Sequence, residues 1–482
     1  MSVRGFEVVI GLEVHVQLLT RTKLFCADAA EYGAPPNTRV CPVCMGLPGA
    51  LPALNEEAVR LAALAALGLG CTLHPESRFE RKSYFYPDLP KGYQITQHER
   101  PLATGGRLDE SDPEAAGRGV RIRRVHLEED TGRSIHDPRS GITALDFNRA
   151  GVPLIEIVTE PDLRSPAQAR AFLRVLKRLL EYLEVSDCDL EKGSLRVDAN
   201  VSLRRVGDGD GVPTELKNLN SFARLESALH HEAERQAEIL RGGGPVRRET
   251  RLWDETKGET RPLRDKEGGA EYRFFAEPDL PPLRLAPAWI AALADTLPER
   301  PIERARRLAA SYHLSREHAH DLTASRPAAD YFEAIVAAGA DPRRAASWVL
   351  REARPVALQA PGAAAGARVP PADLAALLEM EERGQVTRAM AGLLFRRMME
   401  EGITPAAALQ REGMGGVADS GEVARAVAVV LARHGAELRR YRAGEEKLTA
   451  FFIGQVQREL RGRGDVREVE RALRVAVGGR GD

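Results

Sequence analysis

The segment that most constrains the fold of this chain is residues 6–18, with the sequence FEVVIGLEVHVQL. Apolar and polar residues alternate along it, so one face would carry aliphatic side chains and the other would carry Glu13 and His15. Such alternation predicts a half-buried β-strand. A carboxylate and an imidazole two residues apart leave a strand on the same face and can share one cation or one substrate group. A strand with a solvated polar face is the alternative.

Three later segments, 123–134, 152–162 and 194–204, repeat this strand pattern. The polar residues that they place on one face are His126, Glu128 and Asp130 in the first, Glu156 in the second, and Arg196, Asp198, Asn200, Ser202 and Arg204 in the third. A carboxylate inside an otherwise apolar run, such as Glu156, is costly to bury unless a cation or hydrogen-bond donors compensate it. The four strands together predict an acidic site. Oxygen ligands with one imidazole favour Mg2+ or Mn2+ over zinc.

Cysteine usage indicates a metal rather than a disulfide framework, because the chain has an odd number of cysteines, five. A C-x2-C knuckle at 41–44 follows a third cysteine and an aspartate, and a tetrahedral zinc site needs four such ligands. The candidate zinc ligands are Cys26, Asp28, Cys41 and Cys44. Cys71 and His74 are a rival source of the fourth ligand. Three reduced thiols and a redox-active C-x2-C pair are the alternatives to zinc.

A Pro-rich loop within residues 79–97 combines aromatic side chains with two of the chain's nine lysines. The residues concerned are Lys82, Tyr84, Phe85, Tyr86, Lys91 and Tyr93. Aromatic rings interleaved with lysine suit a pocket that stacks a base while neutralising phosphate. A Tyr-rich corner of the core is the alternative. Because an ammonium is a compact point charge that arginine does not always replace, four more lysines are further candidates: Lys192, Lys217, Lys257 and Lys266.

The overall organisation follows from length and from a change in pattern near residue 287. A chain of 482 residues predicts roughly two to four domains, and a net charge of -1 gives no field that points to nucleic acid or a membrane. Strands and helices do not alternate regularly in the first part, which predicts a mostly antiparallel α+β domain. The rest has helical periodicity, except for a Pro/Ala/Gly-rich loop or linker at 354–371. With no signal peptide and no membrane-length apolar run, we expect a cytoplasmic protein.

Several common nucleotide-binding and hydrolase motifs are absent from the sequence. It has no G-x4-G-K-[ST] loop, no strand-to-helix G-x-G-x-x-G, no G-x-S-x-G elbow and no H-E-x-x-H pair. The acidic strands, the Lys/Tyr loop and the helical C-terminal part together predict metal-assisted phosphoryl or acyl transfer on a phosphate-bearing substrate.

Seven motifs carry a resemblance to a known family. In chain order they are VIGLEVHVQL, FYPDLPKGYQITQ, HLEEDTGRS, DFNRAGVPLIEIVTEPD, GSLRVDANVSLR, ELKNLNSF and RFFAEPDLPPL. They closely resemble the GatB family, the B subunits of the glutamyl/aspartyl-tRNA amidotransferases, densely over residues 6–285 and more loosely as far as 451–460. The resemblance implies a kinase and transamidase that phosphorylates the side-chain carboxylate of Glu-tRNA(Gln) or Asp-tRNA(Asn) with ATP and amidates it with ammonia. A tRNA-binding module without chemistry is the alternative, and it would not need clustered Glu and His on strands.

The resemblance also implies domains, partners and residue roles. The expected domains are an antiparallel-sheet catalytic cradle over 1–288, a helical domain over 289–405 and a YqeY-like helical tail over 406–482, the last two contacting tRNA. The expected partners are the amidase (glutaminase) of the complex, which supplies ammonia through a channel, and a small clamping protein, in a heterotrimer that involves no membrane. The implied catalytic residues are Glu13, His15, Glu128, Glu156 and Lys82, of which the first four would bind Mg2+. The implied substrate and ATP residues are Tyr84, Tyr86, Lys91, Tyr93, Asn148, Arg149, Asp198, Asn200 and Lys217.

The sequence departs from the family in two places. Zinc-bearing members have C-x-C before the C-P-x-C knuckle, whereas Asp28 stands at the second position here. A Cys3Asp zinc site and the loss of zinc are therefore both open. The tail has RELRGRGDVRE where the family has a Lys-rich segment containing Asn-Pro, which weakens the expectation of tail contacts with tRNA.

Overall fold

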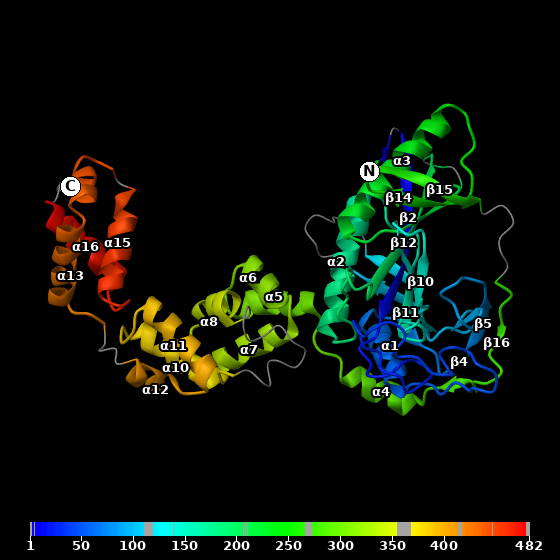
Figure 1. Cartoon of the computed structure of the whole chain (residues 1–482), viewed down its shortest axis with the longest axis horizontal. Helices are drawn as coiled ribbons and strands as arrows, with labels where there is room; N and C mark the ends of the chain where they lie inside the picture. Colours follow the sequence, from blue (N-terminus) through cyan, green and yellow to red (C-terminus); the bar gives the residue numbers. More distant parts are fainter. Residues whose placement is uncertain are drawn as a thin grey trace. The chain divides into compact units, whose positions relative to one another are not determined.

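The structure is a computed structural model, and it describes residues 2–478 except residues 4, 110–118, 138, 206, 208, 210, 266–271, 354–367, 413–416 and 446. The chain forms two compact units, Met1–Arg300 and Pro301–Asp482. Figure 1 shows the helices and strands of both units.

The first unit is built on a ten-stranded sheet with β2 (Phe6–Gln17) near its middle (Figure 1). From edge to edge the strands are β15 (Glu259–Asp265), β14 (Glu249–Asp254), β13 (Thr214–Lys217), β12 (Leu195–Arg204), β2, β11 (Pro153–Thr159), β8 (Val120–Glu129), β7 (Ala103–Leu108) and β3 (Thr72–Leu73), and β1 (Ser2–Val3) pairs with the start of β2. Neighbouring strands are antiparallel except for β13 and β14. The predicted antiparallel α+β fold is confirmed, and the four predicted strands are the contiguous set β12, β2, β11 and β8.

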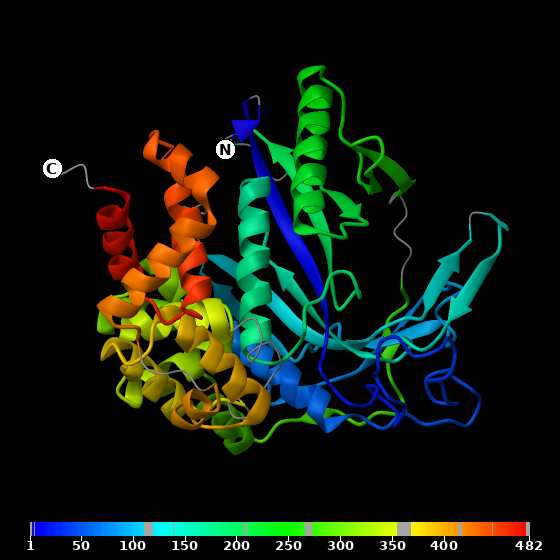
Figure 2. The same ribbon diagram turned by 60° about the vertical axis from the view of Figure 1, so that its left-hand side comes forward.

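Three helices pack on this sheet through the main hydrophobic cluster of the unit; α2 and α3 also contact each other, and Figure 2 shows both beside β2. They are α1 (Glu56–Gly68), α2 (Pro166–Tyr182) and α3 (Phe222–Arg241). Each begins after a residue whose side chain accepts a hydrogen bond from a backbone N–H of the first turn: Asn55, Ser165 and Ser221. The aliphatic residues on one face of β2, including Ile10 and Val14, are buried in this cluster, and the polar residues of the strand lie on the other face.

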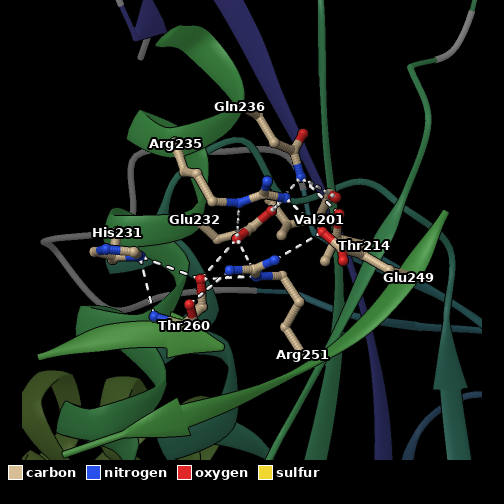
Figure 3. A network of polar contacts seen from close by, with 9 residues as sticks. All are labelled: Val201, Thr214, His231, Glu232, Arg235, Gln236, Glu249, Arg251 and Thr260. Carbon is tan, nitrogen blue, oxygen red and sulfur yellow. Dashed lines mark hydrogen bonds and ion pairs between the residues drawn. The ribbon is translucent and has the colours of Figure 1, made fainter. Parts of the chain in front are cut away.

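A buried polar network joins α3 to the β14–β15 edge of the sheet (Figure 3). The Glu232 carboxylate, which has no exposed surface, accepts hydrogen bonds from Arg235 at 2.7 and 2.9 Å and from Thr260 at 2.9 Å. Arg251 from β14 lies 3.5 Å from the same carboxylate and 2.8 Å from Glu249. Charged groups of both signs are thus paired where the helix meets the sheet.

Smaller sheets flank the central one. They pair β5 (Glu80–Ser83) with β6 (Tyr93–Thr96) and β16 (Phe275–Ala276), β9 (Arg133–His136) with β10 (Thr143–Asp146), and β4 (Glu76–Ser77) with β17 (Leu283–Arg284). Through β16 and β17, residues 272–285 return to the Lys/Tyr loop region predicted from the sequence. Helix α4 (Pro287–Asp295) ends this unit by packing on α1.

Every secondary-structure element that the structure describes in the second unit is a helix, as the sequence predicts. Its elements are α5 (Pro301–Ser311), α6 (Arg316–Leu322), α7 (Arg326–Ala337), α8 (Pro342–Trp348), a π-helical turn η1 (Val349–Ala353), α10 (Pro371–Glu382), α11 (Arg388–Glu401), α12 (Pro405–Arg411), α13 (Ser420–Arg433), α14 (Gly435–Arg442), α15 (Leu448–Glu459) and α16 (Val466–Val477). Two hydrophobic clusters stabilise these helices, one from Leu308 to Ala408 and one from Ala418 to Leu473. Most of the predicted linker at 354–371 lies outside the described residues. Within the described part of the chain, no helix is both long and apolar enough to cross a membrane.

Candidate functional site

Strand register brings the polar residues of β12, β2, β11 and β8 into rows on one face of the sheet. In one row, His15 on β2 lies between Glu156 on β11 and Arg196 on β12. Glu156 in turn faces His126 on β8. The Cβ atoms of directly opposed residues lie about 4.5–5.5 Å apart in such a sheet, so these four side chains share one surface.

His15, Glu128 and Glu156 form a compact group, the acidic cluster, in which one ligand atom from each residue lies within 4.8 Å of the others. The Nδ1 atom of His15 lies 3.1 Å from Glu128 Oε1 and 4.0 Å from Glu156 Oε2. The hydroxyl of Thr96 donates to the other Glu128 oxygen at 3.3 Å. Both carboxylates are buried, and the imidazole is partly exposed. The structure thus brings together three of the four residues predicted to bind magnesium.

The electrostatics of the acidic cluster keep both carboxylates ionised. His126 Nε2 lies 3.4 Å from Glu156 and 3.8 Å from Glu128. Burial alone would lower the pKa of His15, but the hydrogen bond to Glu128 and the charge of Glu156 raise it to about 9. Burial would raise the pKa of Glu156, yet the neighbouring imidazoles, His126 above all, lower it to about 2. Two buried, ionised carboxylates, with the His15 imidazole once it has given up its proton, form a donor set that fits a divalent cation.

Glu13 flanks the acidic cluster in the next row of side chains. It faces Asp198 on β12, and Asn200 Nδ2 donates to Glu13 Oε1 at 3.0 Å. Burial and the neighbouring carboxylates raise the pKa of Glu13. The ammonium of Lys217 pairs with Asp198 and, at 3.3 Å, with Glu215. Among the described residues Glu13 is not part of the 4.8 Å group, so its role as a magnesium ligand stays a prediction.

A second charged group, centred on Asp130, borders the acidic cluster. Gln17 Nε2 donates to Asp130 Oδ2 at 2.8 Å, and Arg196 Nη2 donates to Asp130 Oδ1 at 2.8 Å. Arg149 Nε lies 3.6 Å from Asp130 Oδ2. Burial would raise the pKa of Asp130, but the two guanidinium groups lower it. Two arginines are therefore held beside the cluster by one buried carboxylate.

Strand β5 carries Lys82 and the loop between β5 and β6 carries Lys91, and the two lysines have different surroundings. Lys82 Nζ lies 4.9 Å from the centre of the Tyr272 ring, a cation–π distance, and its charge acts on the Glu128 carboxylate. Lys91 is buried in an ion pair with Glu129. Of these two predicted residues, Lys82 is the one whose charge is directed toward the acidic cluster.

The other residues predicted to bind substrate differ in their contacts. Tyr84 donates a hydrogen bond to Gln94 at 3.1 Å, and an arginine guanidinium stacks 4.2 Å from the centre of the Tyr93 ring. Tyr86 is exposed. The Asn148 side chain bonds three backbone groups in the loop before the cysteine knuckle, at 2.7, 2.8 and 3.3 Å. The substrate roles of these residues stay predictions.

The cysteine cluster also assembles, because one ligand atom from each of the four predicted zinc ligands lies within 4.8 Å of the others. Asp28 Oδ2 is 3.3 Å from Cys44 Sγ and 3.6 Å from Cys26 Sγ. The hydrogen bond from the Cys26 thiol lowers the pKa of Cys44 to about 6. Three thiols and a carboxylate at these separations fit a four-coordinate zinc ion. The rival ligands lie elsewhere: His74 Nε2 is 2.9 Å from a threonine hydroxyl, and Cys71 is not part of the cluster.

Asp130 and Arg196 were predicted to lie on the polar face but were given no role, and Tyr272 was not predicted to lie near the site at all. Strand alternation places the first two on the polar face. Their contact with each other depends on the order of β8 and β12 in the sheet, which the alternation does not encode. Tyr272 reaches Lys82 from a segment far along the chain, and no local pattern signals that approach.

Comparisons with known proteins match nearly the whole chain. A family model described as the GatB/GatE catalytic domain matches residues 8–291, and one described as the GatB domain matches residues 330–476. The chain is 44% identical over 474 residues to the B subunit of the aspartyl/glutamyl-tRNA(Asn/Gln) amidotransferase of Solidesulfovibrio magneticus, covering 98% of this chain and 99% of the relative. It is 43% identical over 479 residues to the B subunit of the same enzyme from Myxococcus xanthus, covering 99% of this chain and 100% of the relative.

Proposed function

Since this chain belongs to the GatB family of tRNA-dependent amidotransferases, we propose that it carries out the ATP-dependent step of that reaction. The substrates in this proposal are ATP and the side-chain carboxylate of Glu-tRNA(Gln), Asp-tRNA(Asn) or both. The γ-phosphoryl group moves to a carboxylate oxygen, which gives ADP and an acyl phosphate. Ammonia then attacks the acyl carbon, the C–O bond to phosphate breaks, and an amide and inorganic phosphate are the products. Phosphorylation is needed because an ionised carboxylate is a poor electrophile with no good leaving group.

The observation that carries this proposal is the acidic cluster on one face of the central sheet. His15, Glu128 and Glu156 would hold Mg2+, with Glu13 as the fourth ligand. Bound there, Mg2+ would neutralise the ATP phosphates and the charge that develops during phosphoryl transfer. Lys82 would place a further positive charge beside the same phosphates.

The remaining predicted residues would bind the substrates around this cluster. We assign the rings of Tyr84, Tyr86 and Tyr93, with Lys91, to the side of the site that receives the nucleotide. On the other side, Asp198, Asn200 and Lys217 line the same sheet face and would orient the aminoacyl group. Arg149 and Asn148 would shape the edge between the two.

The proposed partners are a glutaminase, a small third protein of the complex and the aminoacyl-tRNA. The glutaminase would supply the ammonia, which this chain has no proposed means of generating. The helical unit would contact the tRNA. We place the complex in the cytoplasm, where aminoacyl-tRNAs are made and used.

We also propose that the cysteine cluster holds structural zinc. Its four ligands would be Cys26, Asp28, Cys41 and Cys44, which supply three soft donors and one oxygen. Bound zinc would fix the knuckle without taking part in the reaction.

Co-expression of the full chain with the glutaminase and the small third protein tests the proposed function. We expect ATP- and Mg2+-dependent conversion of Glu-tRNA(Gln), Asp-tRNA(Asn) or both, assayed side by side. His15→Ala and Glu13→Ala should abolish this turnover while tRNA binding, measured by filter binding, survives. Normal turnover in either variant would contradict the assigned site. Binding of tRNA by the wild-type complex without any amidation would instead favour the non-catalytic tRNA-binding module.

A further inference from the structure

We propose that Arg196 binds an oxyanion at the reacting centre, either a phosphoryl oxygen of ATP or the carboxylate of the acceptor amino acid. The inference rests on the proposed function, because that reaction brings two anionic substrates to a face lined with carboxylates. Arg196 lies on β12 directly opposite His15 on β2. Its side chain therefore leaves the sheet on the same face as the acidic cluster.

Asp130 holds the Arg196 side chain in place. Its Oδ1 accepts from Arg196 at 2.8 Å and from the backbone N–H of Thr131 at 2.9 Å, while its Oδ2 accepts from Gln17 at 2.8 Å. The Asp130 side chain is only 3% exposed. A buried carboxylate fixed by two donors besides Arg196 is a rigid support, so the guanidinium bound to it has little freedom to turn.

The guanidinium keeps donors free for a ligand. In the described part of the chain, Asp130 is the one hydrogen-bond partner of the Arg196 side chain, and that bond uses Nη2. The side chain is 33% exposed, so its remaining N–H groups can reach a ligand on the open face. The planar fork of arginine suits bidentate binding of a carboxylate or a phosphate. Arg149, on the same aspartate, instead donates to two backbone carbonyls at 2.7 and 3.0 Å.

The charges around Arg196 explain why the site needs it. Glu13, Glu128, Glu156 and Asp198 all project from the same face. The imidazoles pair with Glu128 and Glu156 and the Lys217 ammonium pairs with Asp198, which leaves little positive charge for an incoming anion. A fixed guanidinium beside them would attract the substrate anion and hold it against the acidic cluster and its cation.

The test uses the full complex with Arg196→Met, Arg196→Lys and a matched control, Arg204→Met. Arg204 lies on the same strand and the same face as Arg196, but its guanidinium pairs with Glu7 at 2.7 Å. Glu7 lies on β2 eight residues before His15, and so away from the acidic cluster. We expect Arg196→Met to lower kcat/KM for amidation by about 100-fold, the usual effect of losing one oxyanion donor. Arg204→Met should stay within about twofold of the wild type.

Two arms identify the anion. Isothermal titration with a non-hydrolysable ATP analogue and Mg2+ measures nucleotide binding, and steady-state kinetics give KM for the aminoacyl-tRNA. Weaker nucleotide binding assigns a phosphoryl oxygen to Arg196. Unchanged nucleotide binding with a raised KM for aminoacyl-tRNA assigns the carboxylate.

Arg196→Lys separates binding from folding, because it keeps the charge near Asp130 and removes only the planar fork. If the methionine variant does not assemble, a loss of about tenfold in kcat/KM for the lysine variant supports the proposal. Kinetics and nucleotide binding within about twofold of the wild type, in a complex of unchanged melting temperature, overturn it. A wild-type complex that lacks ATP-dependent amidation refutes the proposed function instead. In that case, titration with the ATP analogue still tests whether Arg196 binds a phosphoryl oxygen.

Discussion

At the scale of single residues, Asp28 decides the chemistry of the cysteine cluster. Burial would raise the pKa of its carboxyl, but hydrogen bonds from the thiols and the charge of Lys23 lower it. The Lys23 ammonium, on a fully buried side chain, also lies 3.6 Å from Cys44 Sγ. An ionised carboxylate beside three thiols is a competent zinc ligand, and the lysine would offset part of the negative charge of the site.

Zinc content therefore depends on Asp28. We expect about one zinc ion per chain in the wild-type protein. After dialysis against a chelator, Asp28→Ala should retain much less zinc than the wild type, and Asp28→Cys should retain all of it. Plasma mass spectrometry of the purified protein measures the metal. Cys71→Ala, which removes a thiol outside the cluster, serves as the control. Wild-type protein free of zinc would show that the three cysteines are reduced thiols without a metal.

At the scale of secondary-structure elements, the sequence pattern predicts the strands but not their register. Alternation along β2, β8 and β12 is visible locally and correctly separates an apolar face from a polar one, whereas β11 shows only Glu156 inside an apolar run. Which polar residues meet depends on how far each strand is shifted against its neighbour. The contact between Arg196 and Asp130 and the parallel pairing of β13 with β14 arise at this level, and so neither could be read from the segments themselves.

The attachment of α3 to the sheet is a further property of elements that single segments do not predict. Amphipathic periodicity accounts for the apolar face of α3, yet the helix also buries Glu232 against Arg251 of β14 (Figure 3). Removing one partner of a buried ion pair leaves an uncompensated charge, which is far more costly than losing a pair at the surface.

Glu232→Gln should therefore destabilise the protein by about 3 kcal/mol. Glu226→Gln is the matched control, because Glu226 lies on the same helix and pairs with Arg170 at 2.8 Å while 28% exposed. Loss of this surface pair should lower the free energy of unfolding by about 0–1 kcal/mol. Urea unfolding, followed by tryptophan fluorescence and circular dichroism, gives both values. Equal costs for the two variants would mean that the network in Figure 3 contributes no more than a surface pair.

At the scale of the whole molecule, the end of the first compact unit differs from the predicted domain boundary. The sequence and the resemblance predict a boundary at residue 288, whereas the first compact unit extends to Arg300. The difference is helix α4, Pro287–Asp295, which packs on α1. Leu293 is buried in the main hydrophobic cluster of this unit, and Trp289, Ile290 and Leu297 pack against the same cluster.

A fragment of residues 1–300 should accordingly be more stable than one of residues 1–288. Burial of a leucine side chain stabilises a fold by about 1.5–3 kcal/mol. The shorter fragment loses Leu293 together with three partly buried neighbours, so we expect its free energy of unfolding to be lower by at least about 3 kcal/mol. Leu293→Ala in the longer fragment controls for the ends of the chain, and it should cost about 2–4 kcal/mol because it leaves a cavity against α1. Urea unfolding of the three proteins measures these differences. Equal stability of the two fragments would place the boundary at residue 288 and make α4 part of the connection to the helical unit.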